Sequence, residues 1–482
     1  MQSIKISFLL FCLFLCSTAS YPQDTARLSP GQTLTLSQCV EIALKNNLQV
    51  AQSELTMQSS GISRNQALSN LLPSVNASAN QGTNFGKSIN PTTYTYINQT
   101  QNTGNYGLNA GITLFSGLTL QNAIKMNQYM YDASKMDWQQ QKDNITLNVL
   151  LAYLQVLSSG ELLGISREQA AVDAKNVERL EILNREGAIA PSTLYDLKGQ
   201  FANDQVNIIN GINALESAKI FLFQILNIPY QRDIVFEKIP TDISVADYQP
   251  GSDSLYQTAL HTLPVIKSVD LRIKAQQKAI QVNRGQYFPT LSFYGSVSSN
   301  YSDLSTTRIA GTVLPVSTGD YVTVNGTNYN VITQQQEATY VKTSFGDQFK
   351  NNRYTQIGLS LQIPILNYLH VRNNIKQAKV NLKNAVYVAD NTRLQLQQNV
   401  ELAYQNMIAA RGQFASYTEQ FAAYNESLRA ADVKFRAGAI TSVDYVIAKN
   451  NADRASLNLV AARYNLTFRA RILDYYRGSL RF

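Results

Sequence analysis

The spacing of apolar residues changes along the chain, and each change predicts a different kind of element. Over residues 36–71, and again over residues 254–287, apolar side chains recur every three to four positions, which predicts a helix. Both helices are predicted to end before a proline, Pro73 or Pro289, because proline disfavours helical backbone at the residue that precedes it.

Beyond each proline, apolar residues alternate with polar ones, which is the pattern of a strand with one face toward an apolar environment. The alternating segments form two pairs: residues 74–80 with 106–114, and residues 290–298 with 357–365. None of them contains a charged residue, and a length of about 10 residues is enough to cross a bilayer at a tilt. We therefore predict four membrane-spanning strands; the alternative is a half-buried sheet in a soluble domain.

Polar segments join the two strands of each pair. They cover residues 81–105 and 300–353 and are rich in Asn, Thr, Gly and Tyr. Long loops of this kind lie on the cell-surface side of outer-membrane barrels, so we predict surface loops here.

A very long helix follows each strand pair. No proline interrupts residues 118–185 or 368–437, and near 70 helical residues extend for ~100 Å. The second stretch carries a heptad-like row of apolar residues, which indicates coiled-coil packing. The row consists of Met407, Phe414, Tyr417, Phe421, Tyr424, Leu428, Ala431 and Phe435.

Both long helices end at related hexapeptides, Glu-Gly-Ala-Ile-Ala-Pro at residues 186–191 and Ala-Gly-Ala-Ile-Thr-Ser at residues 437–442. Glycine ends a helix readily because it adopts positive φ, and proline or serine suits the start of the next helix. Returning helices are predicted to run to about Leu226 and about Tyr476. Each hexapeptide is therefore the predicted tip of an antiparallel helical hairpin.

The whole order of elements occurs twice. Residues 106–198 align with residues 357–449 at an offset of 357 − 106 = 251, whereas upstream the offset is 259 − 43 = 216. The difference, 251 − 216 = 35, is an insertion in the second copy. Accordingly, the predicted division is a signal peptide, a first repeat, a connector and a second repeat. Their bounds are residues 1–20, 21–226, 227–253 and 254–482.

Composition agrees with a secreted protein that spans a membrane through strands. Charged residues make up 15% of the chain, below the roughly 25% of soluble domains. Lys5 followed by an apolar run predicts a secretory signal, whose removal leaves Cys39 as the one cysteine and no intrachain disulfide. The basic residues behind the net charge of +8 are scattered along helices without a basic block, which predicts solvated helix faces and argues against a nucleic-acid partner.

The sequence lacks the convergent polar chemistry that an enzyme needs. His261 and His370 lie on unrelated segments, and no metal-binding or phosphate-binding motif is present. We predict no enzymatic activity, no catalytic residue, no cofactor and no metal.

Four strands cannot close a barrel, and an open sheet edge in lipid leaves backbone groups unpaired. Several copies must therefore share one barrel: two would supply eight strands and three would supply twelve. Because side chains fill the interior of an eight-stranded barrel, a continuous pore favours three copies or more.

The doubled order of elements over residues 34–476 resembles the TolC-type outer-membrane efflux proteins. The motifs that carry this resemblance are Leu72-Pro73 with Phe288-Pro289, Gly-Leu-x-x-x-Ile at Gly107 and Gly358, and residues 438–448. The resemblance implies an α+β membrane protein with two internal repeats. It implies a homotrimer whose twelve-stranded β-barrel, four strands per chain, continues into a long periplasmic α-helical coiled-coil barrel.

The same resemblance implies partners: outer-membrane lipid, a periplasmic adaptor (membrane fusion) protein and an inner-membrane pump. It also directs attention to the hairpin tips. Asp444 matches a place where acidic residues ring the periplasmic entrance, Ile447 stands where a second acidic residue occurs, and Asp196 follows the first tip. For Asp444 the alternative is a local role in the first helical turn, where the helix dipole favours an acid.

Adaptor contacts are expected at the tips themselves, where small residues allow close packing. The candidates are Gly187, Ala188, Ile189, Ala190, Gly438, Ala439, Ile440 and Thr441. We predict that the chain is the outer-membrane duct of a tripartite export system for small molecules such as drugs or metals. The alternatives are a duct for protein or peptide secretion and a structural coiled-coil protein without a pore.

Overall fold

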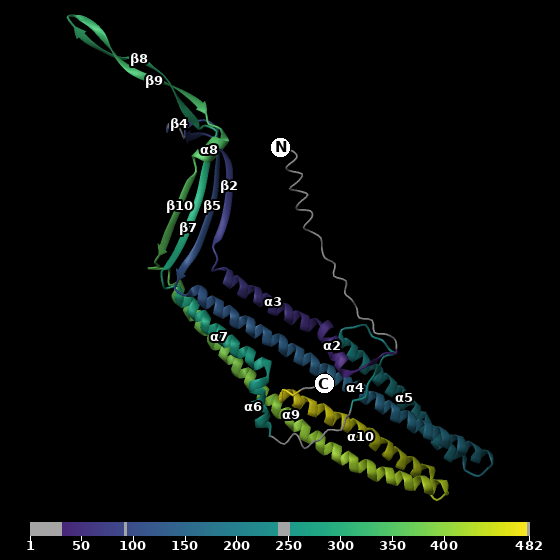
Figure 1. Ribbon diagram of the computed structural model, residues 1–482. Coiled ribbons are helices and arrows are strands. Elements are labelled where there is room, and N and C mark those ends of the chain that lie inside the picture. Colours follow the sequence, from purple (N-terminus) through teal and green to yellow (C-terminus); the bar gives the residue numbers. More distant parts are fainter. Residues whose placement is uncertain (1–30, 91–93, 240–250, 480–482) are drawn as a thin grey trace. The chain divides into compact units, whose positions relative to one another are not determined.

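The computed structural model describes residues 31–90, 94–239 and 251–479 (Figure 1). The predicted signal peptide and part of the predicted connector therefore lie outside the described residues. The chain divides into two compact units. We call them the helical unit (the described residues within 31–59, 131–272 and 386–479) and the strand unit (the described residues within 60–130 and 273–385).

The strand unit is built on an antiparallel four-stranded sheet in the order β10-β7-β5-β2. Its strands are β2 (Ser74–Asn84), β5 (Gln101–Ser116), β7 (Thr290–Ser302) and β10 (Tyr354–Gln362). All four predicted strands are confirmed, and the first three are longer than predicted. The last one ends earlier, two residues before Pro364, because proline has no N–H to donate to a ladder.

The pairing of β5 with β7 joins the two repeats into one sheet. It runs from Thr103 opposite Ser302 to Ser116 opposite Thr290, with one irregularity between Thr113 and Phe115. This arrangement leaves β2 and β10 as the outer strands of the sheet.

Residues 300–353 are more regular than the surface loop we predicted. They contain β8 (Thr306–Val324), β9 (Thr327–Lys342) and the short helix α8 (Phe345–Asn351). β8 and β9 form a hairpin across Asn325 and Gly326, which both have positive φ. An Asn-Gly pair between alternating segments favours such a turn, so the sequence held a signal for this hairpin.

The other predicted loop, residues 81–105, is likewise partly regular. The ends of β2 and β5 extend into it, and it contains a small hairpin of β3 (Lys87–Ile89) and β4 (Tyr96–Asn98). Both segments that we predicted as surface loops therefore contain regular hairpins, which the sequence analysis did not identify.

The first helix of each repeat is broken in two, whereas we predicted single helices. The segments are α2 (Leu36–Asn46) and α3 (Leu48–Ser69), and α6 (Ser252–Thr262) and α7 (Pro264–Gly285). Asn47 and Leu263 separate them in extended conformation. At Leu263 the cause is the following proline, and at Asn47 the side-chain oxygen caps the next helix by accepting a hydrogen bond from Gln49 N at 2.9 Å.

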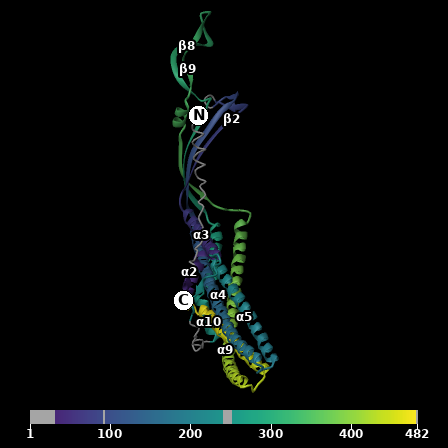
Figure 2. The same ribbon diagram turned by 90° about the vertical axis from the view of Figure 1, so that its right-hand side faces the viewer.

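The long helices match their predicted extent. They are α4 (Thr119–Arg185) and α9 (His370–Arg436), each of 67 residues, and they return as α5 (Pro191–Leu226) and α10 (Ser442–Tyr476). Figures 1 and 2 both show α4 beside α5 and α9 beside α10. In the predicted heptad row, Met407 and Phe414 pack into one apolar cluster and Leu428, Ala431 and Phe435 into another.

One window of α4 is long and apolar enough to cross a membrane by length and composition. Of this window, 61% is buried in the structure. Val149, Tyr153 and Val156 of this region pack into the largest core cluster. The hydrophobicity of α4 is accounted for by this core.

Tyr153 ties this core to two short strands, β1 (Thr33–Leu34) and β6 (Val235–Phe236), which pair in parallel. The Tyr153 hydroxyl lies 3.0 Å from the carbonyl oxygen of Leu34 and 2.8 Å from that of Glu237. Because the hydroxyl is buried, its proton must be donated to one of these carbonyls.

Tyr153→Phe should lower the free energy of unfolding by about 1–3 kcal/mol, because it removes the buried hydroxyl that donates to these carbonyls. The Leu34 carbonyl keeps its hydrogen bond from Glu237 N at 3.1 Å, so the loss falls mainly on the Glu237 carbonyl. Thermal or denaturant unfolding of the purified protein measures this change. Tyr195→Phe is the control, since Tyr195 is 68% exposed and should change stability little. Equal effects of the two substitutions would contradict the role of the Tyr153 hydroxyl.

Candidate functional site: hairpin tips and a buried ionic cluster

The two hairpin tips have nearly the same backbone. Gly187 has a φ of +74°, and Ala188 N donates to the carbonyl oxygen of Leu183 at 2.8 Å. At the second tip Gly438 has a φ of +70°, and Ala439 N donates to Lys434 O at 2.8 Å. The positive φ is the reason for glycine at both places, since a residue with a Cβ is strained there.

The tips also pack together within the helical unit. Ser442 Oγ donates a hydrogen bond of 2.7 Å to Asp196 Oδ2, which links α10 to α5. Ile189 and Ile440 pack against a small apolar cluster that contains Leu194 and Tyr445. Of the predicted contact residues, these two isoleucines therefore face partly inward. The others are exposed: Gly187, Ala188, Ala190, Gly438, Ala439 and Thr441.

Asp444 caps its own helix. Thr441 Oγ1 accepts a hydrogen bond from Asp444 N at 3.1 Å, and Asp444 Oδ2 accepts one from Thr441 N at 3.3 Å. This capping box supports the local role that we weighed for Asp444. The side chain is nevertheless exposed, as is Ile447, which is 55% accessible one turn later. The Asp444 side chain can therefore take part in the helix cap and still face the predicted periplasmic entrance.

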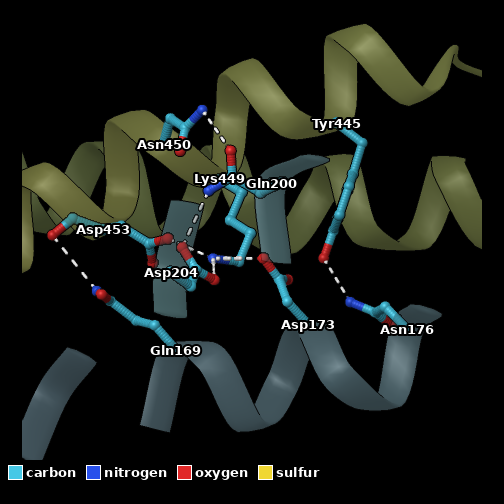
Figure 3. A network of polar contacts seen from close by, with 9 residues as sticks. All are labelled: Gln169, Asp173, Asn176, Gln200, Asp204, Tyr445, Lys449, Asn450 and Asp453. Atoms are coloured by element: carbon cyan, nitrogen blue, oxygen red, sulfur yellow. Dashed lines mark hydrogen bonds and ion pairs between the residues drawn. The ribbon is translucent and has the colours of Figure 1, made fainter. Parts of the chain in front are cut away.

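A cluster of charged side chains is buried behind the tips, between α4, α5 and α10 (Figure 3). Lys449 lies at its centre and is 2% exposed. Its Nζ is 3.1 Å from Asp173 Oδ2 and 3.6 Å from Asp204 Oδ2, and it donates to Asp453 Oδ2 one turn along α10. We call these four residues the Lys449 cluster; one base faces three acids.

Neutral polar side chains surround the Lys449 cluster and connect the same three helices (Figure 3). Gln200 Nε2 donates to Asp204 Oδ1 at 3.1 Å, and Gln200 Oε1 accepts from Asn450 Nδ2 at 3.2 Å. Asn176 Nδ2 of α4 donates to the Tyr445 hydroxyl at 3.1 Å. These bonds fix the rotamers around the ion pairs.

Burial and charge shift the proton affinities in the cluster. The pKa of Asp173 is raised to about 7, first by burial and then by the neighbouring Asp204, with Lys449 acting in the opposite direction. Burial also raises the pKa of Asp453. For Lys449, burial lowers the pKa, but the contacts with Asp453, Asp173 and Asp204 outweigh it and raise the pKa. The cluster can therefore take up a proton on Asp173 near neutral pH.

Tyr445, Lys449 and Asp453 also line a cavity of about 430 Å³ between α4, α9 and α10. Glu168 of α4 and Arg429 of α9 lie on its other walls. Lys449 and Asp453 therefore share this cavity with the charged side chains of Glu168 and Arg429. No group of three or more His, Cys, Asp and Glu side chains is arranged to hold a metal in the part of the chain that the structure describes.

The Lys449 cluster was missed by the sequence analysis, which assigned basic residues to solvated helix faces. That assignment holds for Lys198, the repeat equivalent of Lys449, whose Nζ makes an exposed ion pair of 2.7 Å with Glu181. It is wrong for Lys449. The signal was its place on α10 between Tyr445 and Ala452, which are both buried and lie at helical spacing from it.

Comparisons with known proteins agree over almost the whole chain. The family model described as "Outer membrane efflux protein" matches residues 39–227 and 255–475. Outer membrane protein TolC of Escherichia coli (strain K12) is 21% identical over 454 residues, which span 91% of this chain and 80% of that protein.

Solved outer-membrane channels have the same fold. The channel OprN matches with a TM-score of 0.71 at 16% identity, over 96% of this chain and 95% of that one. The CmeC channel of Campylobacter jejuni matches with a TM-score of 0.68 at 17% identity, over 95% and 91% of the two chains. The predicted helix-rich α+β fold is therefore confirmed.

Lys449→Met should destabilise the helical unit by about 3–5 kcal/mol, because it leaves buried carboxylates without their counter-ion. Lys198→Met is the matched control, since Lys198 occupies the equivalent place in the first repeat but is exposed. Unfolding midpoints at pH 8 measure both. A Lys449→Met protein as stable as the control would show that the cluster contributes nothing to stability.

Stability should also fall as pH rises from about 4 to 7. The folded-state pKa of Asp173, about 7, lies above the usual aspartate value of 3.8, so its contribution is fully present below 3.8 and is lost as pH rises through 7. Asp173→Asn should remove this slope and raise stability at pH 8. Unfolding midpoints of both proteins across this range test the expectation, and parallel pH profiles would contradict it.

Proposed function

The chain belongs to the outer membrane efflux protein family, and we propose that it is the exit duct of a tripartite export system. As in its relatives, the chain is an outer-membrane protein with a periplasmic extension. The proposal rests on one combination: a charge-poor four-stranded sheet with two open edges, in the same chain as two long helical hairpins.

The open edges support a shared barrel. Within the described residues, no other strand of the chain pairs with the outer edges of β2 and β10. Leu359 and Leu361 of β10 and Val75 of β2 are exposed, as expected of side chains that meet lipid or another copy. In lipid these edges need partners, and three copies would give a twelve-stranded barrel wide enough for a pore.

The hairpins would then extend into the periplasm, three copies of each around one axis. We propose that the exposed tip residues, namely Gly187, Ala188, Ala190, Gly438, Ala439 and Thr441, contact a periplasmic adaptor protein, with Ile189 and Ile440 holding the tips in shape. An adaptor and an inner-membrane pump complete the system. Three copies of Asp444 would place carboxylates around the entrance, which favours cations over anions.

We propose small molecules as the cargo, and the description of the matched family as efflux proteins supports this choice. A duct for proteins or peptides uses the same architecture and is the alternative. A structural coiled-coil protein without a pore agrees less well, because it has no use for four charge-poor strands. The homologues are channel proteins rather than enzymes.

The protein mass of the detergent-extracted particle tests the shared barrel. Light scattering with the bound detergent subtracted should give three chains, since a trimer closes both edges of every sheet. A stable folded monomer in detergent would leave the edges of β2 and β10 unpaired and would refute the duct.

Asp444→Asn should reduce the cation selectivity of the channel in planar bilayers. Asparagine keeps an oxygen that can cap the helix, so the change removes the charge at the tip and preserves the fold. Glu426→Gln, an exposed acid on α9 paired with Arg429, is the control. Unchanged selectivity in Asp444→Asn would remove Asp444 from the entrance.

A further inference from the structure

The hairpin formed by β8 and β9 is the most exposed part of the chain. In the described structure the two strands pair only with each other. Every residue of β8 except Thr306, and every residue of β9 except Ala338, is exposed. At ~3.3 Å per residue, the 19 residues of β8 extend for ~60 Å. Figure 1 shows the hairpin as a twisted ribbon.

The composition of this hairpin is unusual for a ribbon in water. Its charged residues are Arg308, Asp320, Glu337 and Lys342. Its large exposed apolar and aromatic residues are far more numerous: Ile309, Val313, Leu314, Val316, Tyr321, Val322, Val324, Tyr329, Val331, Ile332, Tyr340 and Val341. Two-stranded hairpins are at best marginally stable alone, and long edges poor in charge attract other strands.

The tip of the hairpin has two different faces. Val322 lies opposite Tyr329, and Val324 shares their face, because paired residues and alternate residues point to the same side of a ribbon. Thr323 lies opposite Asn328 on the other face, which also carries Tyr321 opposite Asn330. A β-branched residue paired with an aromatic one is a favourable cross-strand contact, and it concentrates apolar surface on one side.

The base of the hairpin is held firmly in the strand unit. Gln348 of α8 is 2% exposed; its side chain accepts a hydrogen bond from Ser302 N and donates one to Ser302 O, both at 2.9 Å. Thr343 N donates to Ser305 O at 3.0 Å. Phe345 of α8 packs edge-on against Tyr106 and Tyr301. The hairpin therefore leaves the sheet from a fixed position between β7 and β10.

That position determines what lies nearby. β9 leads through α8 directly into β10, which is an outer strand of the four-stranded sheet. If copies share a barrel, the neighbouring copy joins at β10, so the hairpin starts beside a subunit boundary. Once the barrel has formed, hairpins of adjacent copies meet at high effective concentration, and weak apolar contacts between them become sufficient.

We propose that the β8–β9 hairpin is a self-association surface, whose apolar tip face of Val322, Val324 and Tyr329 packs on the hairpin of a neighbouring copy. The hairpins then form a collar that continues the barrel beyond the membrane on the cell-surface side. This inference rests on the proposed function, because the shared barrel brings the hairpins together. A second copy explains both the exposed apolar face and the sparse charge along the edges.

Three variants test the collar. In the first, residues 307–341 are replaced by Asn-Gly, which joins the cross-strand pair Thr306 and Lys342 by a short turn. The second, Val322→Lys with Val324→Lys, puts charges on the apolar tip face. The third, Thr323→Lys with Asn328→Lys, puts the same charge on the opposite face and is the matched control.

The readout is the temperature at which the detergent-purified oligomer dissociates. The deletion and the Val322→Lys/Val324→Lys protein should dissociate at least ~5 °C below the wild type, and the control should match the wild type. A normal dissociation temperature in the deletion protein would overturn the collar and leave the proposed function intact. Equal losses in the two lysine variants would overturn the assignment of the apolar face. A monomeric wild type would refute the proposed function itself.

Single cysteines give an independent readout in whole cells. Cys39 is fully buried, and burial raises its thiol pKa to about 12, so it does not compete for thiol reagents. Val322→Cys should form dimers and trimers with a short bismaleimide, whereas Thr323→Cys should form fewer. Absence of crosslinked Val322→Cys would overturn the collar. Impaired export in the deletion protein with unchanged oligomer stability would also overturn it, and would indicate that the hairpin binds a different partner.

Discussion

The pairing of β5 with β7 is the interaction on which the architecture depends. It joins the second strand of one repeat to the first strand of the other over most of their length. Two separate strand pairs thereby become one four-stranded sheet, with β2 and β10 at its edges. An open sheet edge in lipid leaves backbone groups unpaired, so this pairing is the structural basis of the shared barrel that we propose.

The two predicted repeats have the same backbone geometry at their tips but different surroundings at equivalent side chains. Gly187 and Gly438 close equivalent helices with nearly equal φ angles, because only glycine takes that conformation without strain. Lys198 and Lys449 occupy equivalent positions, yet one is exposed and the other lies at the centre of a buried ionic cluster. Equivalent positions therefore share backbone geometry without sharing the environment of their side chains.

The Lys449 cluster joins three long helices, α4, α5 and α10, at one level along their axes. Long apolar helices can slide past one another by a turn at little cost, whereas buried ion pairs have one register in which the charges meet. Asp173, Asp204 and Asp453 approach Lys449 from α4, α5 and α10, and a shift of any helix would leave a buried charge unpaired. We regard register selection as the structural role of this cluster.

The sequence by itself determined the elements whose signals are local. Apolar alternation located the four strands, and uninterrupted stretches without proline located both 67-residue helices. Glycine with a following helix start located the two tips. Local signals also existed for features that we missed: Pro264 divides α6 from α7, and Asn325-Gly326 turns the β8–β9 hairpin. Only the tertiary structure decided which side chains meet: Ser442 with Asp196, Gln348 with Ser302, and Lys449 with three acids. Burial and charge pairing arise between residues far apart in the chain. The sequence alone therefore does not distinguish a buried lysine such as Lys449 from an exposed one such as Lys198.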